Sequence, residues 1–340
     1  MRNTIKIICV IIGAVIGAGF ASGKEIYLFF NCYGVKGILG IILASILTGI
    51  IIYKVLKQIS SEKVINYEEY IKCLGINKTI GKIMLIIINI FLLISFYIMI
   101  AGCCAFFKQE YGVSELITGV IVAFLCYIVL IGNINGVTKI NLILIPFLIG
   151  MIFLIGIKNN LFNLQQIYQT SEQIKDQIIV KNSWLISSIE YASYNSILLI
   201  PMLIGMKQYI QKNEKTVGIV VAFTFGILAI ILFTVLLTGG IQINNIELPL
   251  VYIVNQFGRS YHVIYGIVII AAIFTTAVAT GYSFLENTSR TEKSYKKIAA
   301  MLCISSILVA KIGFSYLVNL LYPIFGILGC FQIFYILKKK

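Results

Sequence analysis

The chain has 340 residues, of which 59% are hydrophobic and only 12% are charged, and its mean hydropathy is +0.98. This composition excludes an ordinary soluble domain and indicates an integral membrane protein. The formal net charge of +14 would suggest nucleic acid as a partner of a soluble protein. Here we attribute it to basic loops beside anionic membrane lipid, and we expect no nucleic-acid partner.

The chain contains about ten apolar stretches that could cross a bilayer, since one helical crossing needs about 20 mostly apolar residues. We therefore predict an all-α integral membrane protein. The predicted spans are 5–31, 34–57, 79–107, 115–132, 138–157, 184–206, 215–238, 262–285, 297–312 and 315–337.

The first span contains the most unusual segment of the chain. Four glycines lie between positions 13 and 23, and Lys24 and Glu25 follow them. At membrane depth, irregular backbone survives only where it is buried in protein or lines a polar cavity. The glycine cluster therefore predicts a broken helix, of the kind that binds ions and substrates. Apolar residues resume after Glu25, so we expect this span to be retained and not cleaved as a signal peptide.

Two short segments outside the predicted spans have a readable role. Residues 66–74 form an amphipathic element with two glutamates and a lysine, which we expect in the cytoplasm. Residues 248–257 are apolar, and Pro249 suits the first turn of a helix. An apolar helix outside the bilayer must pack against protein, so we interpret this segment as a plug over the extracellular mouth.

The connection between the fifth and sixth spans divides the chain. We predict a first five-helix repeat over 1–157, an extracytoplasmic connection over 158–183 and a second five-helix repeat over 184–340. Because each half has an odd number of spans, the halves enter the membrane from opposite sides, so any shared fold is an inverted repeat. The polar run 190–196, followed by Pro201, predicts that the sixth helix is interrupted like the first.

Basic residues alternate between rich and poor loops. Lysines and arginines gather in the loops at 54–82, 207–215 and 290–297 and at both ends of the chain. The positive-inside rule therefore predicts a multi-pass protein of the cell membrane with cytoplasmic N- and C-termini.

The sequence offers little for metal or enzyme chemistry. None of the eight cysteines forms a C-x-x-C pair, and His262 is the only histidine, so neither a zinc nor an iron–sulfur site is expected. We see no nucleophile with an evident base and no ATP-binding motif. We therefore predict that the chain is not an enzyme and has no cofactor other than a possible Na+.

The segment Gly17-Ala18-Gly19-Phe20-Ala21-Ser22-Gly23-Lys24-Glu25, with the following Phe29-Phe30 and Tyr33-Gly34, resembles the opening signature of the YkvI-like family of bacterial membrane proteins. This family is a branch of the amino acid, polyamine and organocation transporter superfamily. The resemblance implies the leucine-transporter-like fold and a secondary transporter of a small organic solute, an amino acid or related amine, coupled to Na+ or H+ by alternating access. A non-transporting nutrient receptor or assembly subunit of the same fold is the alternative.

The resemblance also implies a substrate site at the two predicted breaks. An unwound turn at Ala18-Gly19-Phe20 would present N–H groups to a substrate carboxylate. From its own position, Glu190 is a candidate to receive an amino group or a proton, or else an interfacial carboxylate. The full predicted set is Gly17, Ala18, Gly19, Phe20, Ser22, Glu190, Tyr191, Tyr194 and Asn195.

Sodium-coupled relatives imply an ion site between the first and eighth spans. Its predicted ligands are the carbonyls of Gly13, Ile16 and Ala272 and the hydroxyls of Thr275 and Thr276. The alternative is that these threonines bond to carbonyls of their own helix, as is common in membrane helices.

Glu25 and Lys139 are the remaining coupling candidates. Glu25 has either a structural ion pair with its neighbour Lys24 or a gating role. For Lys139, the resemblance implies that a lysine on this helix can replace Na+ and make coupling proton-dependent. The competing interpretation is that Lys139 snorkels to the membrane surface.

Overall fold

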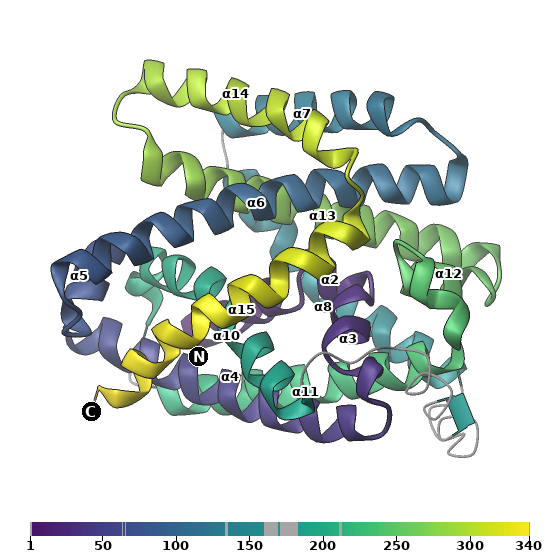
Figure 1. Cartoon of the computed structure of the whole chain (residues 1–340), viewed down its shortest axis with the longest axis horizontal. Helices are drawn as coiled ribbons and strands as arrows, with labels where there is room; N and C mark the ends of the chain where they lie inside the picture. The colour runs from purple at the N-terminus through teal and green to yellow at the C-terminus, as the bar shows by residue number, and fades with distance from the viewer. Residues whose placement is uncertain are drawn as a thin grey trace.

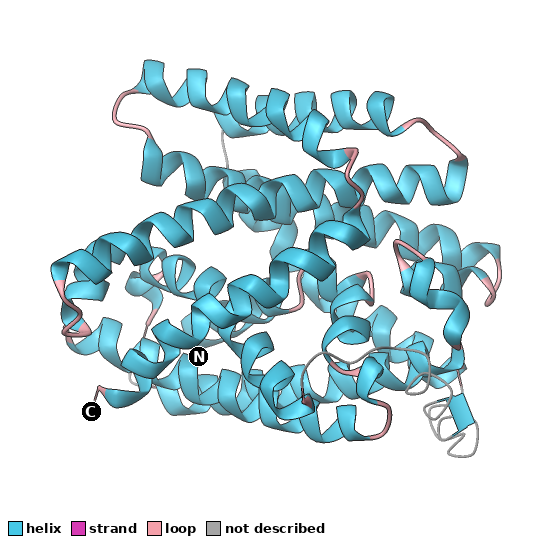
Figure 2. Ribbon diagram, in the orientation of Figure 1, coloured by secondary structure: helices cyan, strands magenta, loops and turns pink. Residues whose placement is uncertain are grey.

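The computed structural model describes residues 2–62, 64, 66–132, 135–159, 169–170, 183–210 and 213–339. Within these ranges the secondary structure is helical, with no strand (Figure 2). The first half contains α1 (Arg2–Val15), α2 (Ala18–Ala21), α3 (Lys24–Phe29), η1 (Asn31–Tyr33), α4 (Lys36–Ser61), α5 (Tyr67–Cys73), α6 (Lys78–Tyr111), α7 (Glu115–Ile131) and α8 (Asn135–Lys158). The second half contains α10 (Trp184–Gly205), η2 (Lys207–Tyr209), α11 (Glu214–Thr238), η3 (Ile241–Asn245), α12 (Pro249–Asn255), α13 (Arg259–Thr288), α14 (Glu292–Ala310) and α15 (Phe314–Lys338).

Each predicted apolar stretch coincides with helix, and the first of them is divided among α1, α2 and α3. Five helices, namely α4, α6, α11, α13 and α15, are long and apolar enough to cross a membrane by length and composition. Large apolar side chains such as Phe124, Phe223 and Ile304 are exposed on the helix surfaces, as contact with lipid requires. These features indicate a multi-pass membrane protein, while the count of ten crossings and the orientation stay predictions.

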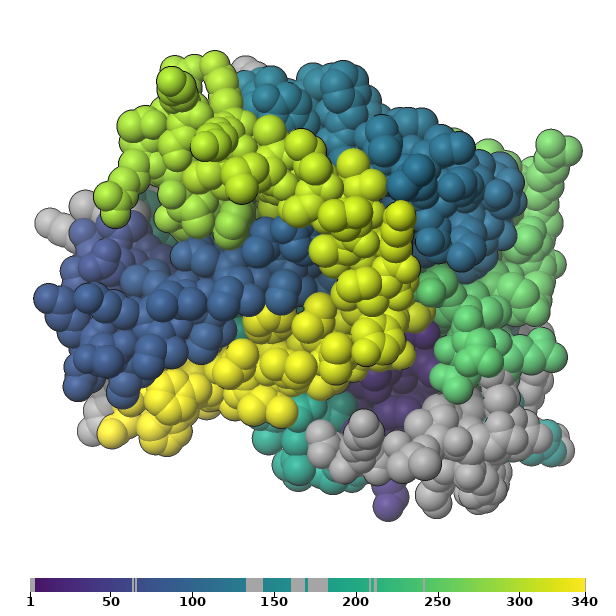
Figure 3. All heavy atoms as spheres, turned by 45° about the horizontal axis from the view of Figure 1, so that its top comes forward, coloured from purple at the N-terminus to yellow at the C-terminus, as the bar shows by residue number. Residues whose placement is uncertain are grey.

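The helices pack in neighbouring pairs around the broken first helix (Figure 1). The pair α7 and α14 lies beside α6 and α13, and α10 packs between α4 and α15. The segments α1, α2 and α3 contact α8, α10, α11, α13 and α15, so they lie at the centre of the bundle. From the face drawn in Figure 3, the N-terminal segment is visible only in a small area.

The two predicted short elements lie at opposite ends of the bundle (Figure 1). Residues 67–73 form α5, and the Asn66 side chain caps it by accepting a hydrogen bond from the N–H of Glu69 at 2.9 Å. Pro249 begins α12, whose apolar side chains Leu250, Val251 and Val254 are buried. Both segments are packed helices, while the cytoplasmic location of the first and the role of the second as an extracellular plug stay predictions.

The predicted interruption of the sixth helix is wrong, because α10 is continuous from Trp184 to Gly205. Its polar side chains satisfy the helix that carries them. Ser193 donates to the carbonyl of Ile189 at 2.6 Å, and Asn195 donates to the carbonyl of Tyr191 at 3.0 Å. Pro201 lies inside the helix without ending it, as membrane helices tolerate when their neighbours satisfy the backbone. The predicted connection 158–183 lies mostly outside the described residues, so the repeat boundaries stay predictions.

Candidate binding site at the break in the first helix

The first helix breaks twice within ten residues. α1 ends at Val15, and Gly17 is extended, with φ −71° and ψ −168°. A single turn, α2, follows, and then Gly23 adopts a left-handed φ of +80° before α3 begins. The predicted break is confirmed, but its position differs. Residues 18–20 are helical, because Ala21 and Ser22 donate backbone hydrogen bonds to the carbonyls of Gly17 and Ala18.

Ser22 stabilises the second break with its own side chain. Its hydroxyl donates to the carbonyl of Gly19 at 2.7 Å, and the backbone N–H of Lys24 donates to the same hydroxyl at 3.1 Å. These bonds supply partners to backbone groups that the helix no longer pairs. Ser22, predicted as a substrate ligand, therefore holds the turn in the described state.

Glu25 folds back over this turn. A Cβ built on Gly19 would lie 1.9 Å from Oε1 of Glu25, so the carboxylate lies directly against the glycine backbone. The Tyr194 hydroxyl donates to Oε2 at 2.5 Å, and the Tyr191 hydroxyl donates to the same atom at 3.5 Å. The carboxylate is buried. A carboxylate of the protein thus occupies the place predicted for a carboxylate of the substrate.

The two predicted site glycines have different surroundings. At Gly19 an added Cβ would overlap Glu25, whereas at Gly17 the nearest atoms to an added Cβ are the Ala14 carbonyl oxygen at 3.5 Å and Thr276 Oγ1 at 3.9 Å. Gly17 also has a negative φ that other residues adopt. The close approach that requires glycine is therefore at Gly19 and not at Gly17.

Lys24 does not form an ion pair with Glu25, which was one of the two interpretations of this position, and the alternative of a gating role for Glu25 stays a prediction. Its ammonium group donates to the carbonyls of Asn244 and Ile246, each at 3.3 Å, and lies 5.9 Å from the centre of the Tyr27 ring. Among the described residues, no ion pair within 4.0 Å includes either Lys24 or Glu25. The lysine instead connects α3 to the segment that precedes α12.

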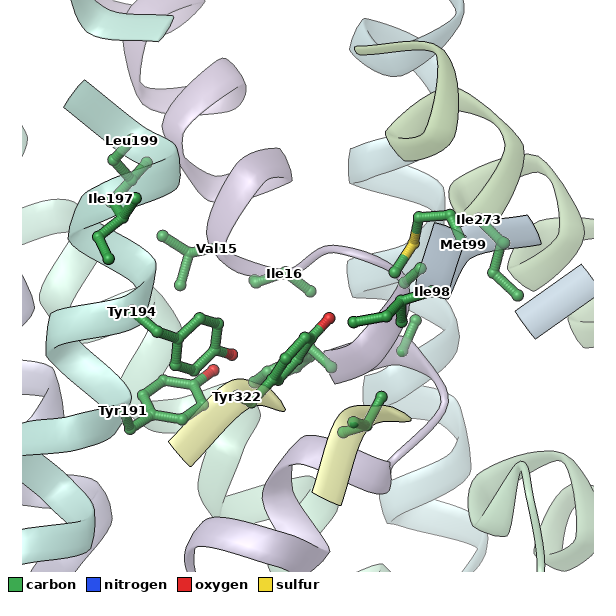
Figure 4. Close-up of a cluster of buried hydrophobic side chains, with 14 of the residues drawn as sticks. Val15, Ile16, Ile98, Met99, Tyr191, Tyr194, Ile197, Leu199, Ile273 and Tyr322 are labelled. Atoms are coloured by element: carbon green, nitrogen blue, oxygen red, sulfur yellow. The ribbon is translucent and has the colours of Figure 1, made fainter. Parts of the chain in front are cut away.

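Aromatic rings surround the buried carboxylate, and we call this set the aromatic cluster. Phe29 stacks on Tyr194 with 5.5 Å between centroids, and Tyr194 stacks on Tyr322 at 4.8 Å. Tyr191 stacks on Phe225 at 5.4 Å. Figure 4 shows Tyr191 and Tyr194 with their hydroxyls side by side, pointing from α10 toward the broken helix, with Tyr322 next to them.

Glu190 and Asn195 lie apart from this contact. Glu190 is buried, and its Cβ lies 2.7 Å from the position of a Cβ added at Gly326, so it packs toward α15. The Asn195 amide bonds to its own helix, as described above. Of the predicted residues on α10, Tyr191 and Tyr194 are the two that contact the carboxylate over the first-helix break.

The predicted sodium ligands are partly brought together. Thr276 lies beside the first break, as its distance to Gly17 shows, and Gly13 belongs to the last turn of α1, whose carbonyls have no continuing helix to pair with. However, the hydroxyls of Thr275 and Thr276 donate to the Ala272 carbonyl at 3.2 and 2.8 Å. The alternative of bonding within their own helix thus holds in this state. No group of three or more His, Cys, Asp or Glu that could hold a metal occurs among the described residues.

Lys139 lies in α8, and the structure describes its backbone alone. Its proposed coupling role therefore stays a prediction.

The end of the site toward α12 is closed by hydrogen bonds to backbone. The N–H of Leu250 donates to the carbonyl of Ser22 at 3.0 Å, and the Tyr265 hydroxyl donates to the carbonyl of Ala21. The Gln109 side chain bonds to both the N–H and the carbonyl of Leu248. Sequence reasoning missed Tyr265, Gln109 and Tyr322, because a single tyrosine in an apolar span, or a glutamine just beyond one, carries no local signal of its partner.

At the opposite end of the bundle, side-chain hydrogen bonds join α5 to α4 and α15. Gln58 on α4 accepts from the Tyr70 hydroxyl at 2.6 Å, and Gln332 on α15 donates to the Tyr67 hydroxyl at 2.8 Å. Lys339 contacts Glu62 at 2.6 Å, and this hydrogen bond and positive charge lower the pKa of the Glu62 carboxyl.

Two proteins of Bacillus subtilis (strain 168) are similar to this chain over nearly its full length. The uncharacterized membrane protein YkvI is 26% identical over 337 residues, which cover 97% of this chain and 94% of YkvI. The uncharacterized protein YyaD is 24% identical over 352 residues, which cover 99% and 98% of the two chains. No family model matches the sequence. The predicted resemblance to the YkvI-like family is confirmed by these relatives.

Solved structures of transporters share the fold. MhsT, solved in complex with L-phenylalanine, matches 96% of this chain and 87% of its own with a TM-score of 0.64 and 20% identity. A Na+-coupled sialic acid symporter, solved in a substrate-bound outward-open state, matches 95% and 75% with a TM-score of 0.56 and 15% identity. The chain therefore has the leucine-transporter-like fold.

Proposed function

We propose that this chain is a secondary active transporter of a small organic solute, with its site at the break between α1 and α3. The observation that carries the proposal is a buried carboxylate, Glu25, inside a doubly broken helix at the centre of the bundle. Breaks of this kind supply ion and substrate sites in transporters that alternate access around a central site. The two structural neighbours named above, one bound to L-phenylalanine and one a Na+-coupled symporter, support this class of function.

Sodium is the coupling ion that we propose, with Thr276 and the carbonyls at the end of α1 as its ligands. Thr276 Oγ1 lies close to Gly17, and hard oxygen ligands of this kind suit Na+ once it sheds water. In the Na+-bound state the Thr276 hydroxyl would keep its donor bond to Ala272 and use a free lone pair for the ion.

Flux measurements on the purified protein test transport. Ligands are first identified by the rise in melting temperature that a compound causes when it binds the folded state. Uptake of a radiolabelled ligand into proteoliposomes is then measured with an inward Na+ gradient, an inward proton gradient or neither. We expect uptake that exceeds equilibration and depends on the Na+ gradient. Binding without flux under any gradient would support the alternative of a nutrient receptor.

A pair of threonine variants tests the sodium ligands. We expect Thr276→Val to raise the Na+ concentration for half-maximal uptake about tenfold. This factor corresponds to about 1.4 kcal/mol, which is the typical contribution of one hydrogen bond. Thr288→Val is the control, because Thr288 makes the same bond within α13, to the carbonyl of Phe284 at 2.7 Å, but lies three turns away. Equal Na+ dependence in both variants would reject the site and direct attention to Lys139 and proton coupling.

The proposal also includes the orientation, with α5 and the chain ends in the cytoplasm and α12 outside. Their location at opposite ends of the bundle supports it. Single cysteines at the exposed positions Gln256 and Lys293, in a background without native cysteines, are probed with an impermeant reagent on intact cells. We expect labelling at Gln256 alone, and labelling at Lys293 alone would reverse the topology.

A further inference from the structure

The Glu25 carboxylate is buried without a counter-charge among the side chains that the structure describes. Its polar contacts are the hydroxyls of Tyr194 and Tyr191 on α10. From α15, Tyr322 stacks on Tyr194, and from α11, Phe225 stacks on Tyr191. Lys24, next in sequence, directs its ammonium group to the carbonyls before α12. A carboxylate in such surroundings is costly unless a cation or a proton joins it.

The surroundings favour an organic cation over a metal ion. A metal ion needs several hard oxygen ligands, but beside the carboxylate and two hydroxyls this site presents the rings of the aromatic cluster. Ring faces attract organic ammonium groups, and a carboxylate adds the counter-charge. An ammonium group would replace the Tyr194 hydroxyl on Oε2, since it offers up to three N–H donors.

The same geometry works against a substrate carboxylate. Glu25 fills the space against Gly19, so a second carboxylate at this turn would meet both an occupied position and a like charge. The place where an amino acid would put its carboxylate therefore already holds the carboxyl group of Glu25, and no positive charge of the described residues is there to attract a second one.

We propose that Glu25 is the counter-ion for the ammonium group of an organic amine that has no carboxylate on the adjacent carbon. This assignment rests on the proposed function, because it names the substrate class of the same site. It also transfers the role of amino-group acceptor from Glu190, which packs toward α15, to Glu25.

Pairs of compounds that differ by one carboxylate test the assignment. The purified chain in lipid nanodiscs is titrated with 2-phenylethylamine against L-phenylalanine, 3-methylbutylamine against L-leucine, and putrescine against L-ornithine. The readouts are the melting temperature and calorimetric binding. We expect at least one amine to bind at least about tenfold more tightly than its amino acid. Glu25→Gln should weaken that amine about 30-fold or more, because it leaves the ammonium without its charge partner.

Two further variants separate this role from folding. Tyr194→Phe keeps the carboxylate and removes one of its donors, so it should keep the preference for the amine. Glu190→Gln neutralises the buried carboxylate that packs toward α15 and should change amine affinity less than about threefold, within the range of a substitution that touches no binding contact. Loss of amine binding in Glu190→Gln with none in Glu25→Gln would overturn the assignment.

The remaining outcomes are also decisive. Tighter binding of the amino acids, binding that ignores Glu25→Gln, stabilisation by Na+ alone that requires Glu25, or no stabilisation by any of the amines would each overturn the inference. None of these readouts depends on flux. Amine binding through Glu25 without uptake in proteoliposomes would retain the inference and reject transport, whereas amino acid uptake that is insensitive to Glu25→Gln would do the reverse.

Discussion

The first helix and α10 both carry polar residues inside an apolar stretch, yet only the first helix breaks. In α10 the Ser193 hydroxyl and the Asn195 amide bond to carbonyls of their own helix. In the first helix the charged groups of Lys24 and Glu25 find partners on other segments, and Gly23 supplies a left-handed turn. The comparison teaches that polarity alone does not interrupt a membrane helix. An interruption needs partners outside the helix and a residue that tolerates the turn.

The continuity of α10 serves the broken helix. Residues three apart lie on one face of a helix, so Tyr191 and Tyr194 both reach the carboxylate of Glu25. An interruption between these tyrosines would separate their hydroxyls. The irregular backbone of one segment is therefore supported by the regular backbone of the other.

The largest effect should come from filling the turn of the first helix. In Gly19→Leu the new side chain overlaps the Glu25 carboxylate and must displace it, so ligand affinity should fall about 30-fold or more, as expected for Glu25→Gln. Binding and uptake are measured on protein that still inserts into the membrane. Gly150→Ala is the control, because an added Cβ at Gly150 meets nothing within 4 Å. Full activity of Gly19→Leu would mean that Glu25 does not lie over Gly19.

A smaller effect is expected on stability at the second break. Gly23→Ala places a side chain at φ +80° and its Cβ 2.9 Å from Leu236 Cδ2, so we expect a loss of about 1–3 kcal/mol in unfolding free energy. Gly75→Ala is the matched variant, since Gly75 has φ +72° but nothing within 4 Å of the added Cβ. It should lose only about 1 kcal/mol, from the left-handed conformation alone. Thermal unfolding in detergent compares the two, and equal losses would contradict the packing at Gly23.

The smallest effect is expected in α10. Pro201→Ala restores a backbone N–H donor to a helix that is already continuous. The free energy of unfolding should therefore change by about 1 kcal/mol or less, and the uptake rate should change correspondingly little. Melting temperature and initial uptake rate are the measurements. If uptake is lost while the protein stays folded, α10 must bend at this position during transport, and the contrast between the two helices would hold for one state only.

The sequence predicts this architecture well where the signals are local. Hydropathy located the long helices, the glycine cluster located the break, and Asn66 and Pro249 marked two short helices. The continuity of α10 was missed because residues such as Ser193 and Asn195 look the same in a sequence whether they bond within their helix or line a gap.

The contacts of the site could not be predicted for a different reason. Lys24 bonds to carbonyls 220 and 222 positions away, and Tyr194 reaches Glu25 across 169 positions. Such partners depend on how the helices pack. The adjacency of Lys24 and Glu25 suggested an ion pair, but neighbouring residues at the start of a helix point in different directions.

The closure at the α12 end separates two properties that evolution can change independently. The N–H of Leu250 and the carbonyl of Ser22 join through backbone atoms alone, so the bond does not depend on which side chain position 250 carries. The residues that would face a solute, Glu25, Tyr191 and Tyr194, take no part in it. If these three side chains face the solute, as we propose, their substitution changes the solute while the bond between Leu250 and Ser22 stays in place.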